Sequence, residues 1–210
     1  MLNRITLPVT PFMQNCSLIW CSATNKAALI DPGGETERLL AAINERGLTL
    51  ERIILTHGHL DHVGGTGELK ANTGVPVEGP GKQDAYWIDG LAQQVQMFGF
   101  DPVPGFTPDR WLNAGDTVTV GEEVLDVYHC PGHTPGHMVL LHKAQRLAFV
   151  GDVLFQGSIG RTDFPGGSHE QLIDSIKHTL LPLGDDITFV PGHGPESTFG
   201  HERLNNPFLR

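Results

Sequence analysis

The chain has 210 residues, a formal net charge of −10 at pH 7, 39% hydrophobic residues and 18% charged residues. This length and composition predict a single folded domain over residues 1–210 and exclude a disordered chain. The acidic balance argues against nucleic acid and anionic membranes as partners, because both require a basic surface.

Short runs rich in Val, Ile and Leu, bounded by Gly, Pro, Asp or Asn, predict β-strands along the whole chain. In chain order they read NCSLIW, KAALID, RIILT, DTVTV, EEVLDVYH, HMVLLH, RLAFVG and ITFVP. Helices are predicted at residues 35–46, with Gly47 as the stop, and at residues 168–181, with Ser168 as the N-cap. Residues 79–109 are expected to form a helix followed by a surface loop. Strands dominate, and no linker divides the chain.

The cysteines and the N-terminal segment indicate a cellular compartment. Cys16, Cys21 and Cys130 are too few and too irregularly spaced for a disulfide framework, so reduced thiols are expected. Pro8 and Pro11 interrupt the first twenty residues, which contain no apolar signal segment, and no run is long enough to span a bilayer. We therefore expect a soluble cytoplasmic protein that is a monomer or a small homo-oligomer.

Coordinating side chains gather at four places, each at the end of a predicted strand. These places read THGHLDH, CPGHTPGH, FVGDVLF and VPGHG. Strand ends can bring residues that are distant in sequence together, and the neighbouring glycines permit close approach to a small ion. The coordinating residues are His57, His59, Asp61, His62, His133, Asp152 and His193. The other histidines and Cys130 are expected to be structural or solvent-exposed.

Five imidazoles and two carboxylates packed together predict a metal site, because their burial is costly unless cations coordinate them. Seven donors are too many for one tetrahedral ion, so we expect two divalent ions that share Asp152 and a bridging water or hydroxide. Zinc is favoured, and iron or manganese also suit these ligands. The expected ligands are His57, His59 and His133 for the first ion, and Asp61, His62 and His193 for the second.

The motif THGHLDH, followed by His133, Asp152 and His193 in this order, resembles the metallo-β-lactamase superfamily. That resemblance implies an α/β (α+β) fold, an αββα sandwich of two facing β-sheets with outer helices and a dinuclear site at one edge. The segments LIDPGG, HCPGHTPGH, GDVLFQGSIGRTDFPGG and ERLNNPF further resemble glyoxalase II, or hydroxyacylglutathione hydrolase. The resemblance is to short relatives that lack the helical C-terminal domain.

This second resemblance implies a thioester hydrolase that cleaves S-(hydroxyacyl)glutathione, such as lactoylglutathione, to glutathione and a 2-hydroxy acid. Such an enzyme serves methylglyoxal detoxification. Metal-bound hydroxide is expected to attack the thioester carbonyl, with Asp61 and Asp152 as the catalytic carboxylates. Arg161, nine places after Asp152, is the candidate for binding glutathione. Asp163 stands where those enzymes have an aromatic contact, which is a departure from their pattern.

The main alternative is a persulfide dioxygenase. The chain also resembles these enzymes, in its segment GRTDF and in the fold that the resemblance implies. Such an enzyme would use a single iron held by His57, His133 and Asp152 to oxidise glutathione persulfide. The hydrolase is favoured because PGHGPESTFG resembles the short glyoxalase II relatives. A zinc β-lactamase would have cysteine in place of Asp152, a flavin-linked reductase would have glutamate in place of His59, and a nuclease would have a basic surface. A purely structural metal domain would need a closed coordination sphere, whereas these donors leave room for a bridge.

Overall fold

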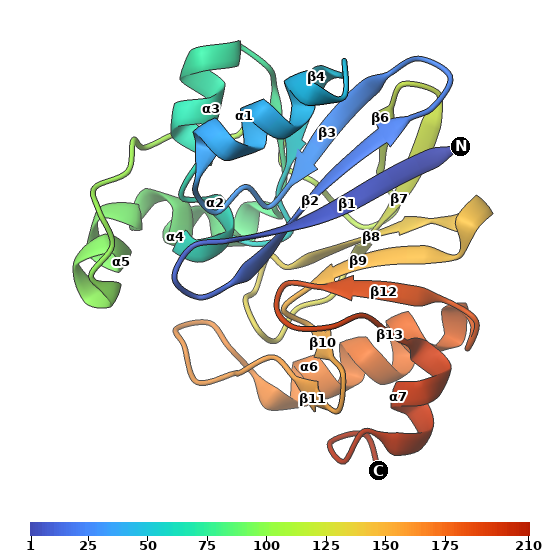
Figure 1. Ribbon diagram of the computed structural model, residues 1–210. Helices are drawn as coiled ribbons and strands as arrows, with labels where there is room; N and C mark the ends of the chain where they lie inside the picture. The colour runs from blue at the N-terminus through green and yellow to red at the C-terminus, as the bar shows by residue number, and fades with distance from the viewer.

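A computed structural model describes residues 1–210 and consists of two β-sheets packed face to face, with helices on both outer sides (Figure 1). The five-stranded sheet has the order β1-β2-β3-β4-β5, and the six-stranded sheet has the order β13-β12-β9-β8-β7-β6. A small hairpin, β10-β11, lies beside the second sheet. This architecture is the αββα sandwich that the resemblance implied.

Each of the eight runs that the sequence predicted corresponds to a strand. The first sheet contains β1 (Leu2–Val9), β2 (Gln14–Cys21), β3 (Lys26–Ile30), β4 (Thr49–Ile54) and β5 (Val77–Glu78). The second sheet and the hairpin contain β6 (Thr117–Val120), β7 (Glu123–His129), β8 (Met138–His142), β9 (Leu147–Gly151), β10 (Leu154–Phe155), β11 (Ser158–Ile159), β12 (Thr188–Pro191) and β13 (Ser197–Thr198).

The helices fall into two groups along the chain. The first group contains α1 (Thr36–Glu45), α2 (Leu60–Val63), α3 (Thr66–Thr73), η1 (Lys82–Asp84), α4 (Ala85–Asp89) and α5 (Leu91–Phe98). The second group contains η2 (Lys143–Gln145), α6 (His169–Asp174), the π-helical turn η3 (Ser175–Leu180), η4 (Leu181–Leu183) and α7 (Phe199–Asn205). No helix has the length and apolar character needed to cross a membrane.

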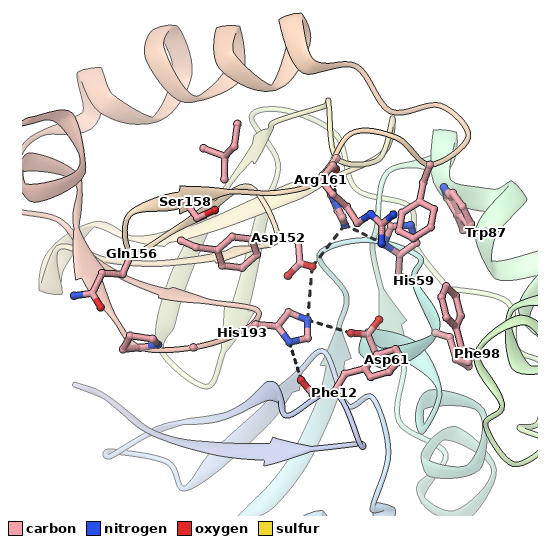
Figure 2. A pocket seen from close by; sticks show the side chains of 17 residues that line it. Phe12, His59, Asp61, Trp87, Phe98, Asp152, Gln156, Ser158, Arg161 and His193 are labelled. Atoms are coloured by element: carbon pink, nitrogen blue, oxygen red, sulfur yellow. Dashed lines mark hydrogen bonds and ion pairs between the residues drawn. The ribbon is translucent and has the colours of Figure 1, made fainter. Parts of the chain in front are cut away.

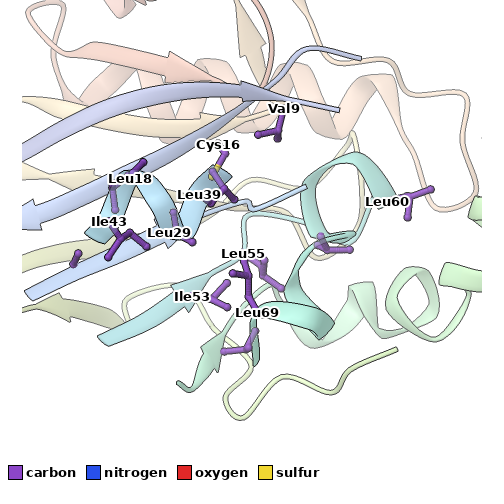
Figure 3. Packing of buried hydrophobic residues seen from close by; sticks show 14 of the residues in the cluster. Val9, Cys16, Leu18, Leu29, Leu39, Ile43, Ile53, Leu55, Leu60 and Leu69 are labelled. Carbon is purple, nitrogen blue, oxygen red and sulfur yellow. The ribbon is translucent and has the colours of Figure 1, made fainter. Parts of the chain in front are cut away.

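The apolar core has three layers, one between the sheets and one under each set of helices. Successive strand residues point to opposite faces, so Ile19 of β2 packs between the sheets while Leu18 packs beneath the first helices. Leu39 and Ile43 of α1 complete that outer layer (Figure 3). Because both faces of each sheet are covered, the strands read as continuous apolar runs instead of alternating ones.

The structure refines several predictions at the level of single elements. The helix predicted over residues 35–46 is α1, and Ser168 caps α6 as predicted, its Oγ accepting a hydrogen bond from Gln171 N at 3.3 Å. Residues 79–109 contain three short helices followed by a loop. The sequence did not predict β1, whose Pro8 pairs with Asn15. Proline is tolerated there because β1 is an edge strand.

Four strands deliver the predicted donors to one edge of the sandwich. His57 follows β4 of the first sheet, whereas His133, Asp152 and His193 follow β7, β9 and β12 of the second. The strands β9 and β12 pair in parallel, and β7 runs in the same direction because β8 separates it from β9 in antiparallel pairing. The loops after these strands therefore open on the same side.

Candidate metal centre

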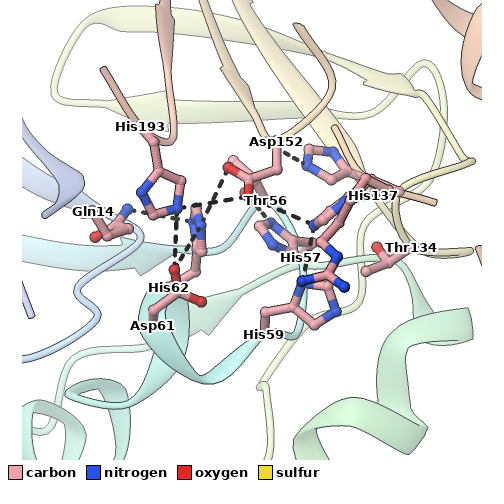
Figure 4. Close-up of polar contacts among 12 residues, drawn as sticks. Gln14, Thr56, His57, His59, Asp61, His62, Thr134, His137, Asp152 and His193 are labelled. Carbon is pink, nitrogen blue, oxygen red and sulfur yellow. Dashed lines mark hydrogen bonds and ion pairs between the residues drawn. The ribbon is translucent and has the colours of Figure 1, made fainter. Parts of the chain in front are cut away.

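The first group of donors contains His57, His59 and His133, which are all buried. Their ligand atoms lie within 4.8 Å of one another, and His133 Nε2 lies 3.0 Å from His59 Nδ1 (Figure 4). The two contributing loops follow different sheets and are 74 residues apart in sequence. The structure therefore brings together the three imidazoles that were assigned to the first ion.

The second group contains Asp61, His62 and His193, and Asp152 lies between the two groups. Asp61 Oδ2 is 3.1 Å from His193 Nε2 and 3.7 Å from His62 Nε2. Asp152 Oδ1 lies 3.3 Å from His62 Nε2, while its Oδ2 lies 3.6 Å from His133 Nε2 and 3.7 Å from His193 Nε2. This central carboxylate faces both groups, as a shared ligand must.

Backbone carbonyl groups orient two of the imidazoles. His133 Nδ1 donates to the carbonyl of Arg161 at 2.8 Å, and His193 Nδ1 donates to the carbonyl of Phe12 at 3.1 Å. These partners assign the proton to Nδ1 and leave Nε2 with a free lone pair that points into the cluster. Both histidines are therefore in the tautomer that binds a metal.

A buried carboxylate, Asp31, orients two further imidazoles. Thr56 Oγ1 donates to Asp31 Oδ2 at 2.6 Å, so it accepts the proton of His57 Nδ1 at 3.0 Å. His62 Nδ1 donates to the same Asp31 oxygen at 2.9 Å. The Nε2 atoms of both imidazoles again remain free to act as ligands.

Unpartnered polar atoms support a cation at this place. His57 Nε2, His62 Nε2 and Asp152 Oδ1 are buried and have no aligned hydrogen-bond partner. Orphaned buried acceptors are costly, and coordination of a cation removes that cost. Imidazole and carboxylate donors without thiolate fit zinc, iron and manganese equally, so the donor set fits divalent cations without selecting one.

The charges of the cluster keep His57 neutral and Asp152 ionised, which are the forms that bind a metal. Burial lowers the pKa of His57 well below its usual range, and neighbouring imidazoles lower it further, which keeps the ring neutral. Burial opposes the negative charge of Asp152, yet His62 and other imidazoles lower the pKa of Asp152 well below its usual value. Burial opposes a charge on His62, yet in the metal-free cluster Asp152 and Asp61 raise the pKa of His62, so a proton on that imidazole supplies the positive charge that a bound cation would replace.

A cavity of about 700 Å³ opens directly onto these donors (Figure 2). Five aromatic side chains line it; Phe155 lies beside His193, and the other four are Phe12, Trp87, Phe98 and Phe164. The rings of these four meet edge to face, with centroids 5.9 Å apart for Phe12 and Phe98 and 6.0 Å apart for Trp87 and Phe164. The volume suits a small-molecule substrate, and the wall suits an apolar group.

Arg161 lies at the rim of this cavity. Its guanidinium is 4.0 Å from the centre of the Phe164 ring and donates two hydrogen bonds to Asp163, at 2.7 and 2.6 Å. Asp163, which departs from the glyoxalase II pattern, is therefore the ion partner of Arg161. Both side chains are exposed, so a substrate anion can compete with Asp163 for the guanidinium.

Three buried residues beside the donors were not predicted. Asp31 lies in the segment LIDPGG, which carries the family resemblance but assigned Asp31 no role, and Asp84 carries no local pattern that distinguishes it from a surface carboxylate. His137 was expected to be an ordinary structural or exposed histidine. It is buried, stacks on His57 with ring centres 4.7 Å apart, and accepts a hydrogen bond from Asp152 N at 3.1 Å. Its spacing of four residues from His133 was the available signal.

Comparison with known proteins identifies the family. A family model described as the metallo-beta-lactamase superfamily matches residues 9–193. The chain therefore belongs to the metallo-β-lactamase superfamily. Within it, the chain is an enzyme of the metal-dependent hydrolase class.

Three of the similar proteins align with nearly the whole chain. A hydroxyacylglutathione hydrolase, GloC of Haemophilus influenzae, is 49% identical over 209 residues, which cover 99% of this chain and 98% of that protein. The crystal structure of the BLEG-1 B3 metallo-beta-lactamase is 34% identical, has a TM-score of 0.89 and covers 100% and 99% of the two chains. The structure of TTHA1623 in a di-iron-bound form is 36% identical, with a TM-score of 0.89 and coverage of 98% and 100%.

Proposed function

We propose that this protein hydrolyses S-(hydroxyacyl)glutathione thioesters, such as lactoylglutathione, to glutathione and a 2-hydroxy acid. The observation that carries the proposal is the convergence of seven imidazole and carboxylate groups, five of which line a cavity with an apolar wall. The GloC relative, which matches over nearly its whole length, supports the same substrate class. Any role in methylglyoxal detoxification follows from that substrate.

The donor set supports two divalent cations with Asp152 as the shared ligand. In this place the cations would supply an activated water at neutral pH and would polarise the thioester carbonyl. The proposed holders are His57, His59 and His133 for the first cation, and Asp61, His62 and His193 for the second.

The side chains of this protein would then orient the water and the substrate and supply the negative charge that holds the cations. Asp61 faces the cavity and contacts His193 Nε2, so its free oxygen can accept a hydrogen bond from a water molecule beside the substrate. Asp152 holds the two halves of the cluster at a fixed separation. The leaving group is a thiolate, whose conjugate acid has a pKa of about 8.5, so no general acid is required.

We expect the two ends of the substrate to contact different parts of the cavity. Phe12, Trp87, Phe98 and Phe164 would contact the acyl group and the carbons next to sulfur. Arg161, at the rim, would pair with a carboxylate of glutathione after that carboxylate displaces Asp163. A charge-assisted bond to the forked guanidinium gives the thiol carrier its orientation.

The test is an assay of protein reconstituted with zinc, iron or manganese, with metal content measured on the same sample. Thiol release from lactoylglutathione that disappears after chelation and returns with metal is the expected result. Two parallel arms use the alternatives, which are oxygen uptake with glutathione persulfide and hydrolysis of a β-lactam. If either arm turned over while lactoylglutathione did not, the proposed substrate would be wrong.

A further inference from the structure

Asp84 lies outside the seven donors, yet its carboxylate joins the two loops that supply the first group. Its Oδ2 accepts hydrogen bonds from Gly58 N at 2.9 Å and from Thr134 Oγ1 at 2.8 Å. Its Oδ1 accepts from Gly136 N at 2.5 Å. Gly58 lies between His57 and His59, and Thr134 follows His133. One side chain thus spans the gap between the segments that carry all three imidazoles.

The three hydrogen bonds to Asp84 require a carboxylate at this position and a close approach of the two loops to it. Three donors converge on a completely buried side chain, and only an acceptor with two oxygens can satisfy all of them. The approach is so close that a Cβ atom at Gly136 would lie 2.7 Å from both Asp84 N and Asp84 Oδ1. Burial raises the pKa of Asp84 to about 6, so the negative charge is costly here. No basic side chain forms an ion pair with it.

A purely local role does not account for Asp84. The residue stands at the N-cap position of α4, where aspartate commonly accepts a bond from its own helix. Its side chain makes no such bond and turns instead toward the two loops. The carboxylate therefore links the two loops by hydrogen bonds and does not cap its own helix.

We propose that Asp84 is a positioning residue that sets the distance between the His57–His59 loop and His133, and thereby the affinity of the first cation. The inference rests on the proposed metal centre. The second cation depends on a different carboxylate, because Asp31 orients His62. Loss of Asp84 should therefore weaken one cation and spare the other.

The test measures zinc affinity by competition with a chromophoric chelator, which resolves two dissociation constants. His59→Ala and His193→Ala identify which constant belongs to which cation. In Asp84→Asn, one carboxylate oxygen becomes an amide that faces backbone N–H groups, so the first constant should rise by about 10- to 100-fold. The second constant should hardly change. Asp89→Asn, at an exposed position on α4, is the matched control and should leave both constants unchanged.

Two further variants keep the test decisive if Asp84→Asn fails to fold. Thr134→Val removes a single donor to Asp84 at nearly constant shape, and Thr134→Ser retains the hydroxyl. The valine variant should weaken the first cation and change the visible spectrum of the cobalt-substituted protein, whereas the serine variant should match the wild type. Equal weakening of both cations, or no difference between valine and serine, would overturn the positioning role. A wild type that bound no zinc would instead refute the metal centre itself.

Discussion

Replacement of Gly192 by alanine should disable the centre without disturbing the fold. The loop after β12 passes so close to the cluster that a Cβ atom at this position would overlap Asp152 Oδ1 and lie 2.6 Å from His62 Cε1. Carbon atoms in contact stay about 3.5 Å apart, so the imidazole must move by about 0.9 Å. A displacement of about 1 Å in a catalytic group can cost roughly 100-fold in rate, and we expect a loss of that size in kcat.

The assay for Gly192→Ala is thiol release from lactoylglutathione, with zinc content and thermal unfolding measured on the same sample. The backbone at Gly192 is not in the left-handed region, so the contact and not backbone strain is the cause. Gly105→Ala is the matched control, because a Cβ atom there meets nothing within 4 Å. Normal kcat and two bound zinc ions in Gly192→Ala would refute the idea that the glycine makes room for Asp152.

Three further predictions concern Arg161, Asp84 and the cations. Arg161→Ala should raise KM for lactoylglutathione by about 10-fold, the effect of one charged hydrogen bond of about 1.5 kcal/mol, with a smaller change in kcat; an unchanged KM would remove Arg161 from substrate binding. The folded pKa of Asp84, about 6, exceeds the value of about 3.9 in an unfolded chain, so its stabilising contribution is present at low pH and is lost as pH rises through about 6. Urea unfolding of the metal-free protein measures this effect. When the pH falls from about 8 to about 5, the free energy of unfolding of the wild type should rise by about 1.4 kcal/mol relative to that of Asp84→Asn. No such rise would mean that the three hydrogen-bond donors stabilise the charged carboxylate more than burial destabilises it. Removal of zinc that had been present at about 1,000 times its dissociation constant should cost about 4 kcal/mol for each of the two cations, a fall of roughly 8–16 °C in Tm for each; an unchanged Tm would argue that the cluster binds no ion.

The strands could be predicted because both sheets are covered by helices, which makes their sequences continuously apolar. Edge strand β1 escaped prediction for the opposite reason, since Pro8 interrupts its pattern and only its place at the edge makes that proline acceptable. Residues 79–109 form three short helices where the sequence predicted one, because α4 and α5 are short and each ends at a glycine.

The donors could be predicted because coordinating residue types are crowded into glycine-flanked segments at strand ends. The supporting residues could not. Asp31 and Asp84 are single carboxylates whose partners lie 25 to 52 residues away in sequence, so only the folded chain gives them a role. His137 likewise acquires its contacts from the approach of β9 to the loop after β7.

The central claim is that residues from both sheets hold two cations around Asp152, and anomalous scattering from crystals grown with zinc tests it most directly. Two peaks on opposite sides of the Asp152 carboxylate are expected, one within bonding distance of His57, His59 and His133, and the other beside Asp61, His62 and His193. One peak that leaves the second set of side chains unbound, or zinc bound elsewhere on the chain, would contradict the account.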